Sequence, residues 1–469
     1  MTEPGRDPAG DDAAVEAAVE DVSPVRQTCT LVLPSSGAFD SRAWRIASTL
    51  AARGHDVTLM ARSEAGLPDR EDHPAGYRIV RVPVSAVAGL PWPLRPLVGG
   101  WRRRRSGARA PGAAAAVSPS GEASPSSAGG AGLVARVRRA ISAVVRLTAI
   151  ALTTRSQRLA TRPLAPHADL VHAMAYMGIP IGLDLGRRDE APVVYDARDI
   201  YVHARNIARL PAFARRLFGA IERRWARAAA RVVTVNRPYA EVMQRSFGGP
   251  LPAIVMNCSS RRPAPPADAP RRFHEALGLA TADRVVLYHG GLAPDRGIEQ
   301  LIDALPLLAP DVHLCLLGYG PLLAKLEAAA GRPEHAGRLH VLPAVPPGEL
   351  LDWVAAADVV AMPIQPSTLN HRLTTPNKLF EAMAAGAPVV ASDLPGMAPI
   401  VRETGCGVLC DPTDPASIAA AIRTILDAPA GERAGYRERA LVAAHGTYSW
   451  EAQVEVLLAE YGRLTGQPW

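Results

Sequence analysis

Short runs of buried-type residues recur along this chain, and each is followed by a segment with helical periodicity. The stretch "TCTLVLPSS" (28–36) predicts a buried strand that ends in a small-residue loop containing Gly37. A helix capped by Asp40 or Ser41 follows, and "DVTLMA" is the next strand. Strand, helix and strand in this order are typical of a parallel sheet covered by helices. The repetition of this unit predicts an α/β fold.

The strand–helix rhythm runs through the chain in two halves. Further strands are predicted at 77–84, 168–174, 191–199, 230–236 and 252–258. After the proline-rich "RRPAPPADAP" (261–270), six more are predicted at 283–291, 312–320, 339–345, 358–364, 387–393 and 407–412. Because 469 residues exceed one ordinary core, we expect two domains. The predicted segments are an N-terminal domain (27–257), a linker (258–272), a C-terminal domain (273–448) and a last helix (449–469) that crosses back.

Several classes of protein do not fit the composition. The acidic N-terminal stretch 1–26 lacks an apolar centre, so it reads as a disordered tail and not as a signal peptide. No stretch approaches the roughly 20 apolar residues of a transmembrane helix. The five cysteines are scattered, which argues against a disulfide framework or a zinc site and favours a reduced, cytoplasmic protein.

The positive charge of the chain is local. Residues 101–165 contain twelve arginines and one acid, Glu122, while the whole chain carries a net charge of +7. We expect 101–132 to be a disordered insertion and 133–160 a basic helix. One face of that helix would carry apolar residues, and Arg136, Arg139 and Arg146 would lie away from it; the apolar set is Val134, Val137, Ile141, Val144, Val145 and, at its edge, Thr148. Three interpretations stay open: an anionic membrane surface, another polyanion, or a linker with a helix packed on the N-terminal domain.

Two motifs in the C-terminal half point to a phosphate-bearing ligand. In "LYHGGLAPDRG" (287–297), Gly290 and Gly291 let the backbone approach a ligand, and Arg296 suits a phosphate. The alternative is a tight turn with a solvent-facing arginine. In "TTPNKLFEAMAAGAPVVASDLPG" (374–396), a predicted helix carries Lys378 and Glu381. Their alternative is a surface ion pair at i,i+3. There is no G-x-G-x-x-G motif for a nicotinamide cofactor.

The order of these motifs resembles that of a known family. "LGYGP" (with Gly318), "VPPGELLDWVAAADVVAMPI", the "PNKLFEAMAAGAPVVASDLPG" stretch and "GCGVLCDPTDPASIAAAI" follow one another as in the C-terminal half of retaining GT-B-fold glycosyltransferases of the family-4 type. In the N-terminal half, "HADLVHAM", "VVYDARD" and "ARVVTVN" look like the acceptor half of those enzymes. The resemblance implies two Rossmann-like domains that face each other across a cleft.

The resemblance also implies roles for individual residues. Glu381 would bind the ribose of a nucleotide-diphosphate sugar, and Lys378 and Arg296 would hold the diphosphate and stabilise the leaving group. The other implied donor-binding residues are Gly290, Gly291, Gly318, Asn370, Pro376, Asn377 and Leu379, and the acceptor side of the cleft would contain Gly37, Asp40, His172 and Arg198. For His172, which ends a predicted strand, a core or capping histidine is the alternative. Retaining members are thought to let the leaving phosphate take the acceptor proton, so no metal or cofactor is expected.

The chain departs from the family pattern at a few positions. Leu373 stands where a first glutamate is common, and Asn370 or His371 would substitute for it. Arg198 replaces a common histidine, so it would bind phosphate or an anionic acceptor, or pair with Asp196 or Asp199. These departures keep open a non-catalytic GT-B partner; a nucleotide-sugar epimerase fits the motif order less well. The leading expectation is a glycosyltransferase of cell-envelope glycan, glycolipid or secondary-metabolite biosynthesis, at the inner face of the membrane, with no nucleic-acid partner.

Overall fold

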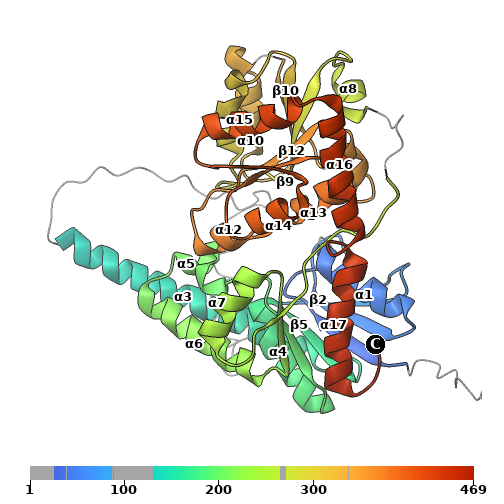
Figure 1. Cartoon of the computed structure of the whole chain (residues 1–469). Helices are drawn as coiled ribbons and strands as arrows, with labels where there is room; N and C mark the ends of the chain where they lie inside the picture. Colours follow the sequence, from blue (N-terminus) through green and yellow to red (C-terminus); the bar gives the residue numbers. More distant parts are fainter. Residues whose placement is uncertain (1–25, 39, 87, 89–129, 265–270, 336) are drawn as a thin grey trace, which may run out of the picture.

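The computed structural model describes residues 26–38, 40–86, 88, 130–264, 271–335 and 337–469. The expected tail (1–26, except Arg26) and the expected insertion (101–132, except its last three residues) therefore lie outside the described residues. Two parallel sheets, each between helices, are stacked along the long axis of the molecule (Figure 1).

The N-terminal sheet has the order β3-β4-β2-β1-β5-β6-β7-β8, and all its neighbours are parallel except β3 and β4. The strands are β1 (Thr28–Val32), β2 (Asp56–Arg62), β3 (Arg70–Asp72), β4 (Arg78–Val82), β5 (Leu170–Met174), β6 (Val193–Asp196), β7 (Arg231–Thr234) and β8 (Ala253–Ile254). Its helices are α1 (Ser41–Ala52), α3 (Gly130–Thr161), α4 (Ala175–Asp189), α5 (Arg205–Ala208), α6 (Ala212–Ala228) and α7 (Arg237–Phe247), with a 3-10 turn η2 (Tyr201–His203). Burial of all of β5, and of β1 after its first residue, explains why both strands are mainly apolar.

The C-terminal sheet has the order β11-β10-β9-β12-β13-β14, all parallel. The strands are β9 (Arg284–Gly291), β10 (Val312–Tyr319), β11 (Leu339–Leu342), β12 (Val359–Met362), β13 (Val389–Ser392) and β14 (Gly407–Cys410). The helices are α8 (Arg272–Leu277), α9 (Ile298–Ala304), α10 (Leu323–Ala330), α11 (Leu350–Ala355), α12 (Leu369–Leu373), α13 (Asn377–Ala384), α14 (Ala398–Thr404), α15 (Pro415–Leu426) and α16 (Ala430–His445). Each of the six strands expected in this half is present.

The last helix, α17 (Trp450–Thr465), leaves the C-terminal domain and runs down the side of the N-terminal one (Figure 1). Its apolar side chains are buried in the N-terminal core with those of β1 and α1. The indole Nε1 of Trp450 donates to Thr49 Oγ1 at 2.9 Å, and Gln453 Oε1 accepts from the backbone N–H of Met256 at 2.8 Å. Both contacts attach α17 to the N-terminal domain.

Candidate functional site

The carboxyl ends of β9 and β10 approach each other closely in the C-terminal domain. A Cβ on Gly318 would lie 2.0 Å from the carbonyl oxygen of Gly290, so only glycine fits there. Gly290 has φ +99°, which also favours glycine, and Lys378 Nζ lies 3.9 Å from where its Cβ would be. The bare backbone at the end of β9 therefore faces the side chain of Lys378.

Glu381, on α13, is held by a histidine. His289, at the end of β9, is buried, and its Nε2 donates to the Glu381 carboxylate at 2.9 Å. Burial opposes ionisation of Glu381, but the hydrogen bond from His289 and the charges of Arg45 and Lys378 keep the pKa of this carboxyl below its ordinary value. Glu381 is therefore an oriented carboxylate and not half of a surface i,i+3 pair with Lys378.

Lys378 and Arg296 form a pair of neighbouring cations. The Lys378 ammonium lies 3.7 Å from the centroid of the Tyr288 ring. Burial, and then the charge of Arg296, lower the pKa of Lys378 to about 7, while Glu381 acts in the opposite direction. Within the described part of the chain, neither cation has an ion-pair partner. Two neighbouring positive side chains that form no ion pair with a described residue suit a ligand that brings negative charge.

The other residues near α13 that the sequence associated with donor binding differ in how exposed their side chains are. Leu379 is completely buried in the core, so only its backbone can contact a ligand. Pro376 precedes α13 and is half-buried, and Asn377 is exposed at its first residue. Leu373, which occupies the position of the missing glutamate, packs against the N-terminal core.

Asn370 bridges the two domains. Its Oδ1 accepts from the Ile200 backbone N–H at 3.0 Å, its Nδ2 donates to Asp199 at 2.8 Å, and its carbonyl accepts from the Tyr239 hydroxyl at 2.9 Å. Nearby, the Asn236 amide donates to the Leu373 carbonyl at 2.8 Å. The side-chain amide of Asn370 is thus engaged by the N-terminal domain, although the sequence predicted a donor-binding role.

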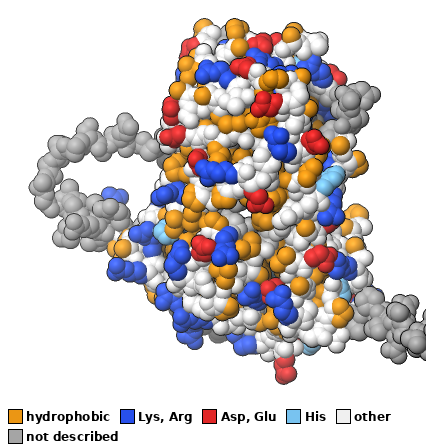
Figure 2. Space-filling view, in the orientation of Figure 1, with side chains coloured by type: hydrophobic (Ala, Val, Ile, Leu, Met, Phe, Trp, Pro, Cys, Tyr) orange, Lys and Arg blue, Asp and Glu red, His pale blue; other side chains and the backbone are white. Residues whose placement is uncertain are grey.

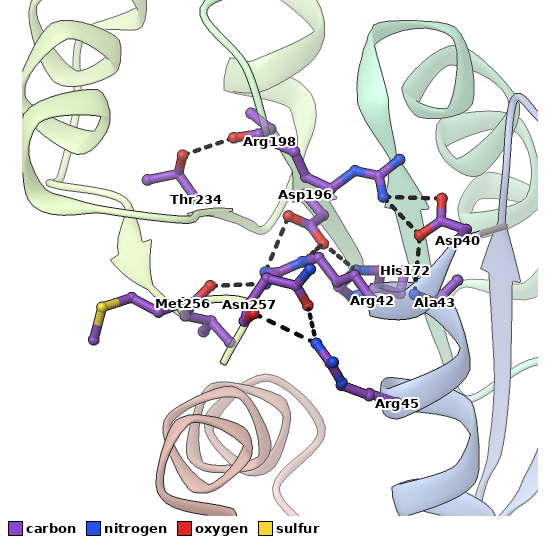
Figure 3. Close-up of polar contacts among 12 residues, drawn as sticks. Asp40, Arg42, Ala43, Arg45, His172, Asp196, Arg198, Thr234, Met256 and Asn257 are labelled. Carbon is purple, nitrogen blue, oxygen red and sulfur yellow. Dashed lines mark hydrogen bonds and ion pairs between the residues drawn. The ribbon is translucent and has the colours of Figure 1, made fainter. Parts of the chain in front are cut away.

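The N-terminal side of the site contains Arg198 and Asp40 (Figure 3). Arg198 Nη1 donates to both Asp40 oxygens, at 2.8 and 2.9 Å, so its partner is Asp40 and neither Asp196 nor Asp199. Asp40 also caps α1 by accepting from the Ala43 N–H at 3.1 Å. Gly37, with φ +80°, turns the loop after β1, and its carbonyl accepts from the Trp44 indole at 2.7 Å.

His172 does not line the cleft, so that prediction is wrong and the alternative, a core histidine, is the one that the structure shows. His172 is completely buried, with its Nε2 3.2 Å from Asp196 and its Nδ1 2.7 Å from the Tyr461 hydroxyl of α17. Asp196 also accepts from Arg42, at 2.6 Å from Nε and 3.2 Å from Nη2 (Figure 3). Both ring nitrogens of His172 are therefore committed to a core network.

The sequence patterns assigned no site role to three polar residues of this region, His289, Arg45 and Asp199. His289 was visible as the residue before Gly290-Gly291, but its carboxylate partner was not. Arg45, on α1, bonds Asn257 Oδ1 at 3.0 Å and is near enough for its charge to lower the pKa of Glu381. Burial raises the pKa of Asp199 despite its hydrogen bond from Asn370. Nothing in the local pattern distinguishes the last two from surface residues.

A cavity of about 590 Å³ lies in the N-terminal domain beside the interface. Its lining includes Asp199 and Ile200, which contact Asn370, and the side chains of Arg215, Arg216 and Glu222 from α6. Glu222 is 3% exposed, and burial raises its pKa to about 7, although the Tyr195 hydroxyl donates to it at 2.8 Å. The cavity wall is mainly apolar, with Arg223 among its polar groups.

Among residues with described positions, no cluster of His, Cys, Asp and Glu has the arrangement needed to hold a metal ion. Within the described ranges, no helix is both long and apolar enough to span a bilayer.

Two family models match the chain in its two halves. The model described as "Glycosyl transferase 4-like domain" matches residues 37–259. The model described as "Glycosyl transferases group 1" matches residues 283–428, which contain Arg296, Lys378 and Glu381. The boundary between the matches falls between the two sheets.

Relatives and solved structures agree with these matches. A D-inositol 3-phosphate glycosyltransferase of Xylanimonas cellulosilytica is 28% identical over 310 residues, 63% of this chain and 72% of that protein. That of Segniliparus rotundus is 34% identical over 192 residues, 39% of this chain and only 41% of that protein. Sucrose-phosphate synthase from Thermosynechococcus elongatus has a TM-score of 0.67 at 19% identity, over 94% of this chain and 100% of that one. Anabaena HepE in complex with UDP has a TM-score of 0.61 at 19% identity, over 93% and 100%. The predicted fold is confirmed.

Proposed function

Since this chain belongs to the GT-B-fold glycosyltransferases of the family-4 type, we propose that it transfers a sugar from a nucleotide-diphosphate sugar with retention of the anomeric configuration. The observation that carries the proposal is the pair of cations Arg296 and Lys378, which have no ion-pair partner among the described residues and lie beside the oriented carboxylate of Glu381. A diphosphate would supply the missing negative charge, and the ribose hydroxyls would donate to Glu381.

The proposed chemistry needs stabilisation of the leaving group above all. Negative charge grows on the diphosphate as the bond to the sugar breaks, and Lys378 and Arg296 would neutralise it in place of a divalent ion. The bare backbone at Gly290 and Gly291 would allow the phosphates to come close. On the retained face of the sugar, a leaving phosphate oxygen would take the proton of the acceptor hydroxyl.

We place the acceptor in the cavity beside Asp199. Both relatives are named for D-inositol 3-phosphate, an acceptor that carries a phosphate. Arg215, Arg216 and Arg223 would attract an acceptor with an anionic group, and the apolar wall would hold an apolar portion. Such an acceptor suits a cell-envelope glycan, a glycolipid or a secondary metabolite, presented at a membrane surface.

Ligand-induced thermal stabilisation tests the donor site. The full chain would be heated with UDP, GDP, dTDP and ADP sugars, and we expect one base to stabilise it, by about 2.7 kcal/mol at a hundredfold excess over the dissociation constant. Glu381→Ala and Lys378→Ala should lose the effect, while the exposed matched pair Glu438→Ala and Lys325→Ala should keep it. Stabilisation without turnover for any acceptor would favour the non-catalytic partner. Full transferase activity in both site variants would refute the assignment.

A further inference from the structure

Two neighbouring helices of the N-terminal domain expose an apolar surface. We call it the α3–α6 face and define it by six side chains that are between 39% and 61% exposed: Ile141, Val144 and Val145 of α3, and Phe213, Leu217 and Ile221 of α6. An apolar groove of about 460 Å³ joins the two helices, lined by Leu147, Ile150, Leu217, Ile221 and Trp225 among others. The sequence pattern had placed the first three on one helical face, and the structure leaves that face uncovered by the described residues.

The charges around this face have one sign. α3 contains no aspartate or glutamate along its whole length, and the only acid of α6, Glu222, is buried. The exposed charged side chains are arginines, among them Arg138 and Arg146 on α3 and Arg224 on α6. In Figure 2, blue side chains gather among orange ones at the lower left, where Figure 1 places α3 and α6.

Helical spacing puts arginines on the same sides as the apolar residues. Arg138 precedes Ile141 by three residues and Val145 by seven, and Arg224 follows Ile221 by three and Leu217 by seven. Long arginine side chains can extend from an apolar surface to phosphates while their stems stay in apolar contact. Apolar residues bordered by basic ones are typical of helices that lie in the headgroup region of an anionic membrane.

We propose that the α3–α6 face docks onto the surface of an anionic lipid bilayer. This inference deepens, and rests on, the proposed presentation of the acceptor at a membrane. One side of α6 lines the proposed acceptor cavity, and another side contributes to the α3–α6 face. A second copy of the chain fits the face less well, since a symmetric contact would bring two arginine-rich surfaces together. Phe213 is the one aromatic ring among the six side chains of the face, so a nucleic acid would find little to stack upon.

Vesicle co-sedimentation of the full chain tests the docking without donor or acceptor. The vesicles would be phosphatidylcholine alone or mixed with anionic phosphatidylglycerol. We expect binding to the anionic vesicles, weakened by salt, and little to the neutral ones. Val144→Asn with Leu217→Gln should lower the partition coefficient by about tenfold or more, because two apolar contacts are lost. Arg138→Gln with Arg224→Gln should remove most of the dependence on anionic lipid.

Val442→Gln provides the matched control, because Val442 is 67% exposed on α16, in the C-terminal domain. It should bind like the wild type. The proposal is overturned if the wild type ignores anionic vesicles, or if Val144→Asn/Leu217→Gln binds as well as Val442→Gln. It is also overturned if sedimentation velocity shows a dimer that the same double variant dissociates, since a second copy would then cover the face. Nucleotide-sugar stabilisation, measured on the same variants, reports separately on the donor site.

Discussion

Lys378 carries a charge that depends on its surroundings. Because burial and Arg296 lower its pKa to about 7, much of this side chain is neutral above that pH in the free protein. A bound diphosphate favours the ammonium form and raises the pKa, so binding takes up a proton between the two pKa values. We therefore predict that affinity for a nucleoside diphosphate falls as pH rises above about 7, by up to about tenfold per pH unit. Calorimetry in buffers with different ionisation enthalpies would count the protons.

Lys378→Arg is the informative variant for this prediction. A guanidinium stays charged throughout the range, so the variant should bind with little proton uptake and a flatter pH profile. Lys325→Arg, at an exposed position on α10, should behave like the wild type. Proton uptake by Lys378→Arg equal to that of the wild type would show that another group titrates.

The buried network between α1, β5, β6 and α17 shows how whole elements depend on a few polar atoms. Arg42 and Asp196 are 1% and 0% exposed, and the hydrogen bond from Tyr461 to His172 ties α17 to the sheet. Asp196→Ala leaves a buried guanidinium without its counter-ion, so we predict a loss of about 3–5 kcal/mol in the free energy of unfolding. Tyr461→Phe leaves one buried acceptor unpaired and should cost about 1–3 kcal/mol.

Urea denaturation followed by circular dichroism would measure both losses. Arg78→Ala is the control, because its ion pair with Asp72 is largely exposed and should contribute little. A Tyr461→Phe protein as stable as the wild type would mean that α17 is held by its apolar contacts alone.

Sequence patterns predicted elements better than they predicted polar partners. All six C-terminal strands were visible, because short runs rich in apolar residues identify buried parallel strands. β3 was missed, since "RED" is three charged residues whose pairing with β4 is decided by tertiary context. Glu381 and Lys378 lie together because one helix carries both. Arg42 on α1 reads as a surface residue, and only the folded sheet brings Asp196 to it.

The hydrogen-bond partners of His172 could not be predicted from the sequence either. Its position in a strand was predicted correctly, but the fate of its ring depends on Tyr461, which lies 289 residues later. No local pattern encodes a contact at that separation. The exposed apolar face of α3 is similar: periodicity shows which side chains share a face, but not whether another element covers it.

The two domains are joined at the site by the contacts of α12. The Asn370 side chain accepts a hydrogen bond from the Ile200 N–H and donates one to Asp199, and Leu373 packs against the N-terminal core. These contacts hold Arg296 near Asp199. The positive charge of Arg296 partly offsets the rise in the pKa of Asp199 that burial causes. The domain interface is therefore expected to control access to the proposed donor site.

Asn370→Ala tests this coupling. The variant removes both side-chain hydrogen bonds but keeps the carbonyl that accepts from Tyr239, so we predict a looser interface without unfolding. Amide hydrogen exchange should show faster exchange at the Ile200 N–H, which donates to the Asn370 side chain, and unchanged exchange in β9 and β10. Nucleotide-sugar affinity should fall a few-fold, because closure would then have to be driven by binding. Unchanged exchange at Ile200 together with unchanged affinity would mean that apolar packing of Leu373 alone keeps the domains together.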